Sequence, residues 1–202
     1  MTELPARHHP LESFFRTVPA TDDGRAEVEI KIRPNLDYIN LRGDPADARF
    51  ATAVAEILQQ ELPLVANTMR GGPISIFWLG PDEWLIVTRA GHGAALAVSL
   101  GDTVSDFHAS VNELHGGQIA LRLSGPRSVE ILAKGCTLDL HARSFAAGDC
   151  AQTGLGKANV LIGKVSEDPV FDVIVRRSFA EYLANWLKTA GAEFGVRFSM
   201  AE

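Results

Sequence analysis

The segment Gly148-Asp149-Cys150-Ala151-Gln152-Thr153-Gly154-Leu155-Gly156-Lys157 is the part of this 202-residue sequence that comes nearest to a known chemical motif, the phosphate-binding loop. That loop requires G-x-x-x-x-G-K-[ST], because the hydroxyl after the lysine binds magnesium and the glycines let the backbone surround the phosphates. Here Ala158 follows Lys157, and Ala151 occupies the position of the first glycine. A strand pattern follows where the motif needs a helix. The segment therefore does not indicate a nucleoside triphosphate site.

Soft metal ligands are few and lack the spacing of a metal site. Outside the first 25 residues they are His92, His108, His115, His141, Cys136 and Cys150. None of the spacings C-x-x-C, H-x-x-x-H or H-E-x-x-H occurs among them. Cys136, His141 and Cys150 could converge within one loop, but buried free thiols and surface histidines are the expected arrangement. We therefore predict no metal site.

The candidate groups for nucleophilic or acid–base chemistry also have structural explanations. Ser124-Gly125-Pro126 lacks the G-x-S-x-G pattern of a nucleophile elbow, and Ser124 is expected to cap the next helix. Asp106 and Asp172 are candidates for a buried functional carboxylate at a strand end, although solvated or capping roles are favoured. The adjacent Asp82 and Glu83 lie in a turn signature and are expected to be solvated. We predict no catalytic and no cofactor-binding residue on this chain.

Aromatic and basic residues offer contacts rather than chemistry. Trp78 and Trp84 flank one turn, so one could face the core and the other a partner or ligand. Trp186 has helical spacing with its apolar neighbours and is expected to pack in the core. Arg176 and Arg177 could hold a carboxylate or phosphate, with solvated edge charges as the default, and Ser178 is a suitable N-cap.

Composition excludes several classes of function. The net charge of −6 and the pI near 5.5 argue against a nucleic-acid binder or a membrane-surface binder. No run of 18 apolar residues is long enough for a transmembrane helix. Two cysteines form no disulfide framework, and residues 1–10 have no apolar region typical of a signal peptide. We therefore expect a cytoplasmic protein.

Hydrophobic periodicity predicts that a β-α-β-β-α unit occurs twice, giving an α+β fold. The first half combines strands at 36–41, 74–79 and 84–87 with a helix that Asp44 caps and Pro63 ends, and a second helix at 92–100. The second half combines strands at 118–123, 159–165 and 170–175 with helices at 127–133 and 179–190. Equivalent elements are offset by about 82 to 88 residues by subtraction of these positions.

The predicted domain organisation is an N-terminal arm at 1–25 and a single domain at 26–202, made of two pseudo-repeats at about 26–102 and 103–202. A strand at 28–32 precedes the first unit. In the arm, Leu11, Phe14 and Phe15 have helical spacing and must be buried, either in the chain's own core or against a partner. The longest irregular segment is predicted at 136–157, and such long loops often carry an interaction.

Several separated motifs give the sequence a family resemblance over roughly residues 36–195. They are Leu79-Gly80-Pro81-Asp82-Glu83-Trp84-Leu85, Leu121-Arg122-Leu123-Ser124-Gly125-Pro126, Lys134-Gly135-Cys136-Thr137-Leu138-Asp139-Leu140, Ala151-Gln152-Thr153 and Arg177-Ser178-Phe179-Ala180-Glu181-Tyr182-Leu183. In these motifs the chain resembles the gamma subunit of heterotetrameric sarcosine oxidase. The resemblance implies the folate-binding fold of the glycine-cleavage aminomethyltransferase, a duplicated α+β arrangement.

The same resemblance implies a complex of alpha, beta, gamma and delta subunits that oxidises sarcosine to glycine and hydrogen peroxide and passes a one-carbon unit to tetrahydrofolate. FAD, FMN, NAD, zinc and tetrahydrofolate would then belong to the partner subunits, with no cofactor on this chain. A related N-methyl amino acid could replace sarcosine as the substrate. The family motifs look structural here, so the resemblance assigns this chain no catalytic residue.

Two other functions remain open at this stage. One is a free-standing folate-binding protein that serves one-carbon transfer or iron–sulfur maintenance, since folate-binding proteins of the latter kind carry K-G-C-Y-x-G-Q-E. This chain has Lys134-Gly135-Cys136 but continues Thr137-Leu138-Asp139-Leu140, without the Tyr, Gly and Gln. The other is a scaffold subunit with no link to folate.

Overall fold

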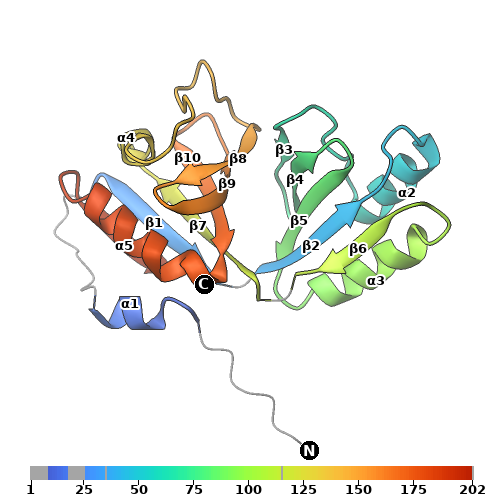
Figure 1. Cartoon of the computed structure of the whole chain (residues 1–202), viewed down its shortest axis with the longest axis horizontal. Coiled ribbons are helices and arrows are strands. Elements are labelled where there is room, and N and C mark those ends of the chain that lie inside the picture. Colours follow the sequence, from blue (N-terminus) through green and yellow to red (C-terminus); the bar gives the residue numbers. More distant parts are fainter. Residues whose placement is uncertain (1–8, 18–25, 35, 115, 202) are drawn as a thin grey trace, which may run out of the picture.

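The computed structural model consists of two lobes, each built on one β-sheet (Figure 1). It describes residues 9–17, 26–34, 36–114 and 116–201. The first lobe has a five-stranded sheet in the order β3-β4-β5-β2-β6, and the second a six-stranded sheet in the order β11-β1-β7-β10-β9-β8. The predicted α+β class and duplication are therefore confirmed.

In the first lobe, two helices cover one face of the five-stranded sheet. Its strands are β2 (Leu36–Arg42), β3 (Met69–Arg70), β4 (Ser75–Gly80), β5 (Glu83–Arg89) and β6 (Ser110–Glu113), and its helices are α2 (Ala48–Leu58) and α3 (Gly93–Thr103). The apolar spacing of α2 places Phe50, Val54 and Leu58 in one buried cluster with Trp84 of β5. The order β2-α2-β4-β5-α3-β6 is a split β-α-β arrangement.

The second lobe repeats this arrangement with two additional strands, β1 and β8. It contains β1 (Val28–Arg33), β7 (Gln118–Ser124), α4 (Ser128–Ala133), β8 (Cys150–Leu155), β9 (Ala158–Lys164), β10 (Val170–Arg176), a 3-10 turn (Arg177–Phe179), α5 (Ala180–Ala190) and β11 (Val196–Met200). The order β7-α4-β9-β10-α5-β11 matches the first lobe. Strand β1 lies between β7 and β11, antiparallel to β7 and parallel to β11.

Each sheet takes a strand from the other half of the sequence. Strand β1 lies in the first half of the sequence but belongs to the second lobe, and β6 follows residue 103 but pairs with β2 in the first lobe. Figure 1 shows the blue strand β1 among strands coloured for the second half. The division into an arm at 1–25 and pseudo-repeats at 26–102 and 103–202 stays a prediction.

The N-terminal helix α1 (Glu12–Thr17) packs on the core of the second lobe. Leu11 and Phe14 are 0% and 2% exposed, and the Phe14 ring lies 4.9 Å from the Phe198 ring of β11. Of the two burial sites considered for the arm, the chain's own core is therefore observed for these side chains. The rest of the predicted arm, residues 1–8 and 18–25, lies outside the described residues.

Several predicted helix boundaries differ from the structure by about one turn. Asp47 caps α2 by accepting from the backbone N–H of Arg49, whereas the predicted cap Asp44 accepts from Ala46 in the preceding turn. Helix α2 ends because Gln59 adopts a left-handed conformation (φ 55°), four residues before the predicted stop at Pro63. The predicted irregular segment at 136–157 is also shorter, because its last residues form β8 and pair with β9.

Candidate functional site

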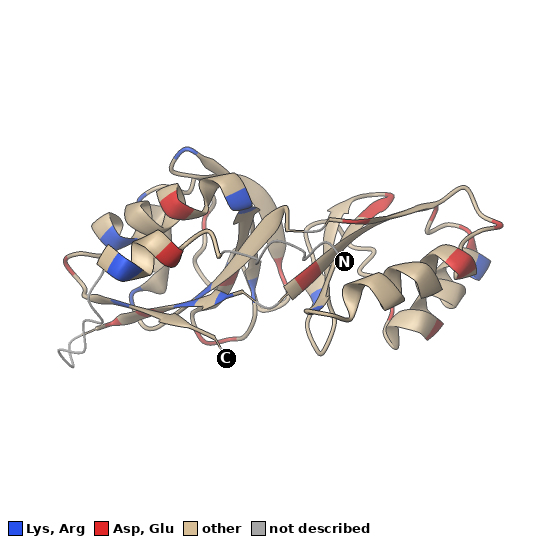
Figure 2. Cartoon of the chain, turned by 90° about the horizontal axis from the view of Figure 1, so that it is seen from below, with Lys and Arg blue, Asp and Glu red and all other residues tan. Residues whose placement is uncertain are grey.

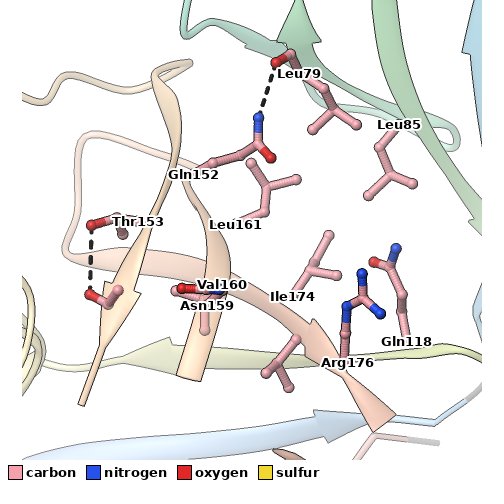
Figure 3. Close-up of a pocket in the computed structure, with 12 residues that line it drawn as sticks. Leu79, Leu85, Gln118, Gln152, Thr153, Asn159, Val160, Leu161, Ile174 and Arg176 are labelled. Atoms are coloured by element: carbon pink, nitrogen blue, oxygen red, sulfur yellow. Dashed lines mark hydrogen bonds between the residues drawn. The ribbon is translucent and has the colours of Figure 1, made fainter. Parts of the chain in front are cut away.

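A cavity of about 540 Å³ lies where the two sheets meet (Figure 3). Leu79 and Leu85 reach it from β4 and β5 of the first lobe, while β7, β8, β9 and β10 of the second lobe supply the other lining residues. These are Gln118, Gln152, Thr153, Gly154, Asn159, Val160, Leu161, Ile174, Val175 and Arg176. A concave site between lobes is a common place for a small-molecule ligand.

The cavity combines an apolar part with a polar rim. Leu79, Leu85 and Ile174 form the apolar part, and Figure 3 shows the side chains of Gln118 and Arg176 side by side at its edge. These two residues are cross-strand partners in β7 and β10. Of the described lining residues, only Arg176 has an ionisable side chain, so the cavity is suited to binding a molecule with polar groups and an anionic group beside an apolar part, not to acid–base chemistry.

Polar and apolar contacts join the two sheets beside the cavity. The amide nitrogen Nε2 of Gln152 in β8 donates to the backbone oxygen of Leu79 in β4 at 2.9 Å. Tyr38, Phe77 and Leu85 of the first lobe share one buried cluster with Leu161 and Ile174 of the second. This interface fixes the orientation of the lobes and therefore the shape of the cavity.

A buried carboxylate lies on the same face of the six-stranded sheet as the cavity. Asp172 of β10 is 2% exposed and receives Nε and Nη2 of Arg122, each at 2.7 Å, in a bidentate pair. Nη1 of Arg33 in β1 donates to Asp172 Oδ2 at 3.0 Å. The hydrogen bonds from Arg122 to this carboxylate raise the pKa of that guanidinium. Asp172 thus neutralises arginines, which is a structural role.

Tyr38 of β2 faces this ion cluster from the first lobe. Its side chain is 3% exposed, and its hydroxyl makes no hydrogen bond to the described residues. Burial raises the pKa of the Tyr38 hydroxyl, while Arg33 acts in the opposite direction. The hydroxyl therefore stays protonated at neutral pH and is unsuited to act as a base.

The two cysteines are separate buried thiols. Sγ of Cys150 lies 3.1 Å from the backbone oxygen of Thr68, and burial raises its pKa to about 12. Sγ of Cys136 lies 3.7 Å from the hydroxyl of Thr153. Across residues 9–17, 26–34, 36–114 and 116–201, no three His, Cys, Asp or Glu side chains group as a metal ion requires. His115, one of the candidate ligands, lies outside the described residues.

The segment that is similar to a phosphate loop forms a hairpin. Residues from Cys150 to Leu155 are strand β8, Gly156 and Lys157 form the turn, and β9 follows. Gly156 needs its left-handed conformation (φ 59°), and a Cβ there would lie 2.7 Å from the Tyr182 hydroxyl. That hydroxyl accepts from the backbone N–H of Lys157 at 2.9 Å, so this turn packs on α5 instead of enclosing a phosphate.

The Ser124-Gly125-Pro126 turn connects β7 to α4. Gly125 has φ 120°, and a Cβ there would lie 2.2 Å from the backbone oxygen of Glu27, so close packing against β1 requires glycine. Ser124 is the last residue of β7 and does not cap the helix, since Arg127 occupies the N-cap position without a side-chain hydrogen bond. The predicted cap at Ser124 is therefore wrong.

The remaining predicted residues are distributed over the surface and the core. Asp106 is exposed, Asp82 pairs with Arg42 at 2.9 Å, and Glu83 accepts from the amide of Asn40, which agrees with solvated or structural roles. Ser178 is the predicted N-cap of the last helix, but it lies in the 3-10 turn. Phe179 occupies the N-cap position of α5. Arg177 is exposed and, unlike Arg176, does not line the cavity.

The three tryptophans differ in burial and in their contacts. Trp84 is 0% exposed and its indole N–H donates to the backbone oxygen of Pro63 at 2.9 Å. Trp78 is its cross-strand partner and is half-buried, so it is the one that could contact a partner or ligand. Trp186 packs against the second-lobe core, and a Cβ on Gly135 would lie 2.4 Å from its ring.

Sequence reasoning missed most residues of this region. Gln118, Gln152 and Asn159 line the cavity, and Arg33, Arg122 and Tyr38 surround Asp172. The signal that could have found the ion cluster is the charge at alternate positions of predicted strands, where an apolar residue is expected at a covered face.

Among the described residues, no helix is long and apolar enough to span a membrane.

Comparison with known proteins gives a consistent family. Residues 42–193 match the family described as "Sarcosine oxidase, gamma subunit family". The chain is 34% identical over 191 residues to a sarcosine oxidase subunit gamma from Corynebacterium sp. (strain P-1), covering 93% of this chain and 91% of that protein.

Two solved structures show how far the fold is shared. Heterotetrameric sarcosine oxidase from Corynebacterium sp. U-96, in complex with pyrrole 2-carboxylate, contains a chain with a TM-score of 0.83 and 27% identity, covering 93% of this chain and 96% of that one. The glycine cleavage system aminomethyltransferase T from Bartonella henselae matches with a TM-score of 0.62 and 19% identity, covering 86% of this chain and 48% of that one. The latter likeness shows a shared fold.

Proposed function

Because the chain belongs to the sarcosine oxidase gamma subunit family, we propose that it is the gamma subunit of a heterotetrameric sarcosine oxidase. The observation that carries this proposal is the likeness to a chain of such a heterotetramer, which spans 93% of this chain and 96% of that one. Agreement over nearly the full length of both chains means that this chain contains the elements of such a subunit. It therefore takes part in an oxidoreductase complex.

The proposed reaction of the complex is the oxidative demethylation of sarcosine to glycine, with transfer of the one-carbon unit to tetrahydrofolate. We assign the catalytic groups to other subunits, which we propose to be alpha, beta and delta, with FAD, FMN, NAD, zinc and tetrahydrofolate bound there. Two features of this chain support that assignment. Asp172 is neutralised by two arginines, and Cys150 keeps its proton because its pKa is about 12.

Zinc in particular does not fit the donor set of this chain. A zinc ligand must be a thiolate, a neutral imidazole or a carboxylate. The Cys150 thiol lies against the backbone oxygens of Thr68 and Trp78, which cannot form a tetrahedral site with it. Cys136 is on the other side of β8, beside Thr153. We also propose that the complex is cytoplasmic, and that it binds neither nucleic acid nor membrane.

Reconstitution tests the proposal directly. The purified chain is expected to show no flavin absorbance and no sarcosine oxidation. Co-expression with the remaining subunits should give a complex that contains this chain and oxidises sarcosine, and omission of this chain should reduce the yield of assembled complex. Flavin absorbance of the lone chain, or full assembly and activity without it, would contradict the proposal.

A second candidate, a free-standing folate-binding or one-carbon-transfer protein, is favoured by one observation. The cavity between the sheets has an apolar part beside Arg176, an arrangement that suits a flat molecule with a carboxylate. Calorimetric titration of the lone chain with a tetrahydrofolate derivative separates the two candidates. Tight binding that is lost in Arg176→Ala favours the second candidate, and no heat of binding favours the first or a scaffold role without folate.

A further inference from the structure

The six-stranded sheet has a face that the helices do not cover, and this face is divided into two parts. One part is apolar and packs against the first lobe through Ala120, Leu161 and Ile174. The other part lies on β1, β7 and β11, at the end of the sheet away from the first lobe. Most of its side chains are charged, Lys31 and Arg197 are each 48% exposed, and at its inner edge Tyr38 of the first lobe faces the Asp172 ion cluster.

Strand alternation places four cations on this second part. Lys31 of β1 lies opposite Arg122 of β7, and Glu29 of β1 lies opposite Arg197 of β11. Arg33 is two residues after Lys31 and therefore shares its face. We call Lys31, Arg33, Arg122 and Arg197 the basic strand face. Figure 2 shows Lys and Arg segments along the strands at the lower edge of the left-hand lobe, on the side away from its helices.

Two carboxylates balance these four cations only in part. Glu29 contacts both Lys31 at 3.5 Å and Arg197 at 3.4 Å, and Asp172 contacts both Arg122 and Arg33. The face therefore has an excess of two positive charges, in a chain whose net charge is −6. The side chains of Lys31 and Arg197 are each 48% exposed, so this charge acts on the solvent.

The arginines at the centre of the face are held in fixed positions. Asp172 is 2% exposed and accepts two hydrogen bonds of 2.7 Å from Arg122, while one nitrogen of Arg33 donates to the same carboxylate. A guanidinium has five N–H donors, so both arginines keep donors for another acceptor. Such fixed guanidinium groups bind carboxylates with little further loss of side-chain freedom.

We propose that the basic strand face is the docking surface for an acidic segment of another subunit of the complex, an inference that rests on the proposed function. Charge complementarity selects this occupant, because an excess positive face on an acidic chain attracts carboxylates. A nucleic acid would meet repulsion from the remainder of a chain with net charge −6. The charges also extend over three adjacent strands, which fits a protein segment better than a small anion.

The test uses the complete complex and a pair of matched variants. Lys31→Glu with Arg197→Glu reverses two exposed charges of the face. Arg49→Glu with Arg143→Glu causes the same change in net charge at two other exposed sites, whose side chains are 82% and 76% exposed and lie on α2 and in the loop before β8. Each variant is mixed with the remaining subunits, and the apparent Kd for assembly is measured at low and high salt.

The basic strand face variant should assemble with an apparent Kd raised at least about tenfold at low salt, and high salt should reduce the difference. The control variant should stay within about twofold of wild type. A milder variant, Lys31→Gln with Arg197→Gln, should give an intermediate Kd and keeps the test valid if charge reversal impairs folding, which circular dichroism reports.

Equal apparent Kd values for the basic strand face variant and the control would overturn the inference. It would also be overturned if the basic strand face variant lost binding to an oligonucleotide but assembled like wild type. Failure of the wild-type chain to assemble with the other subunits would overturn the proposed function and this inference with it. If wild type and the control assemble and the basic strand face variant is impaired, the result supports both the proposed function and this inference.

Discussion

Replacement of Asp172 by Asn should destabilise the chain through the arginines it leaves behind. Asp172 is 2% exposed, whereas the side chains of Arg122 and Arg33 are 34% and 28% exposed. Removing one partner of a fully buried ion pair costs about 3–5 kcal/mol. Because water reaches both guanidinium groups here, we discount that range to about 2–3 kcal/mol for Asp172→Asn.

Thermal unfolding followed by circular dichroism measures this cost. For a chain of this size, about 1 kcal/mol corresponds to roughly 2–4 °C in Tm, so Asp172→Asn should lower Tm by about 4–12 °C. Replacing the pair together, as Asp172→Leu with Arg122→Leu, should recover part of the loss, since only Arg33, which is 28% exposed, then lacks its carboxylate. Arg33→Leu should cost less than Asp172→Asn, because Arg33 makes one contact of 3.0 Å.

The reasoning is refuted by two results. A Tm for Asp172→Asn within about 1 °C of wild type would mean that the carboxylate does not compensate the arginines. If the double variant loses, relative to wild type, as much stability as the sum of the losses of Asp172→Leu and Arg122→Leu alone, Asp172 and Arg122 act independently.

Three further outcomes are expected from the same unfolding measurements. Phe14→Ala should cost about 3–4 kcal/mol, because the ring packs in the second-lobe core, and a loss under about 1 kcal/mol would show that α1 is only loosely attached. Gly125→Ala should cost at least about 2 kcal/mol because a Cβ would lie 2.2 Å from a backbone oxygen, whereas Gly154→Ala, with no atom within 4 Å, should stay within about 0.5 kcal/mol. Burial raises the pKa of Cys150 from 9.0 to about 12, so its contribution to stability is complete below pH 9 and is lost as the pH rises toward 12. Cys150→Ala should therefore lose less stability than wild type between pH 9 and pH 11, and parallel decreases in Tm would contradict that burial effect.

The repeated order of elements could be predicted because it is a local pattern. The alternation at β1 and the helical spacing of Phe50, Val54 and Leu58 were sufficient to place those elements. The N-cap of α2 was predicted wrongly because Asp44 and Asp47 both suit that role. Which of them caps the helix depends on where the preceding turn ends. Strand β8 was missed because its alanine, glutamine and glycine do not favour a strand until β9 provides a partner.

The ion cluster and the cavity depend on contacts between distant parts of the chain. Asp172 and Arg33 are separated by 139 positions, and Asp172 and Arg122 by 50. Only the strand register brings them together, and the register between strands that are distant in the sequence is not evident from the local pattern of either strand. Gln152 and Leu79 are separated by 73 positions, so the cavity could not be anticipated from either segment alone.

The place of β1 in the six-stranded sheet has a consequence for synthesis on the ribosome. The five-stranded sheet uses only strands between Leu36 and Glu113, so the first lobe can be completed while the chain is still growing. Strand β1 emerges earlier but must wait for β7 and finally for β11, close to the C-terminus, with both of its edges unpaired. Glu29, Lys31 and Arg33 give this waiting strand a charge at every second position, and such charges hinder pairing with strands of other nascent chains.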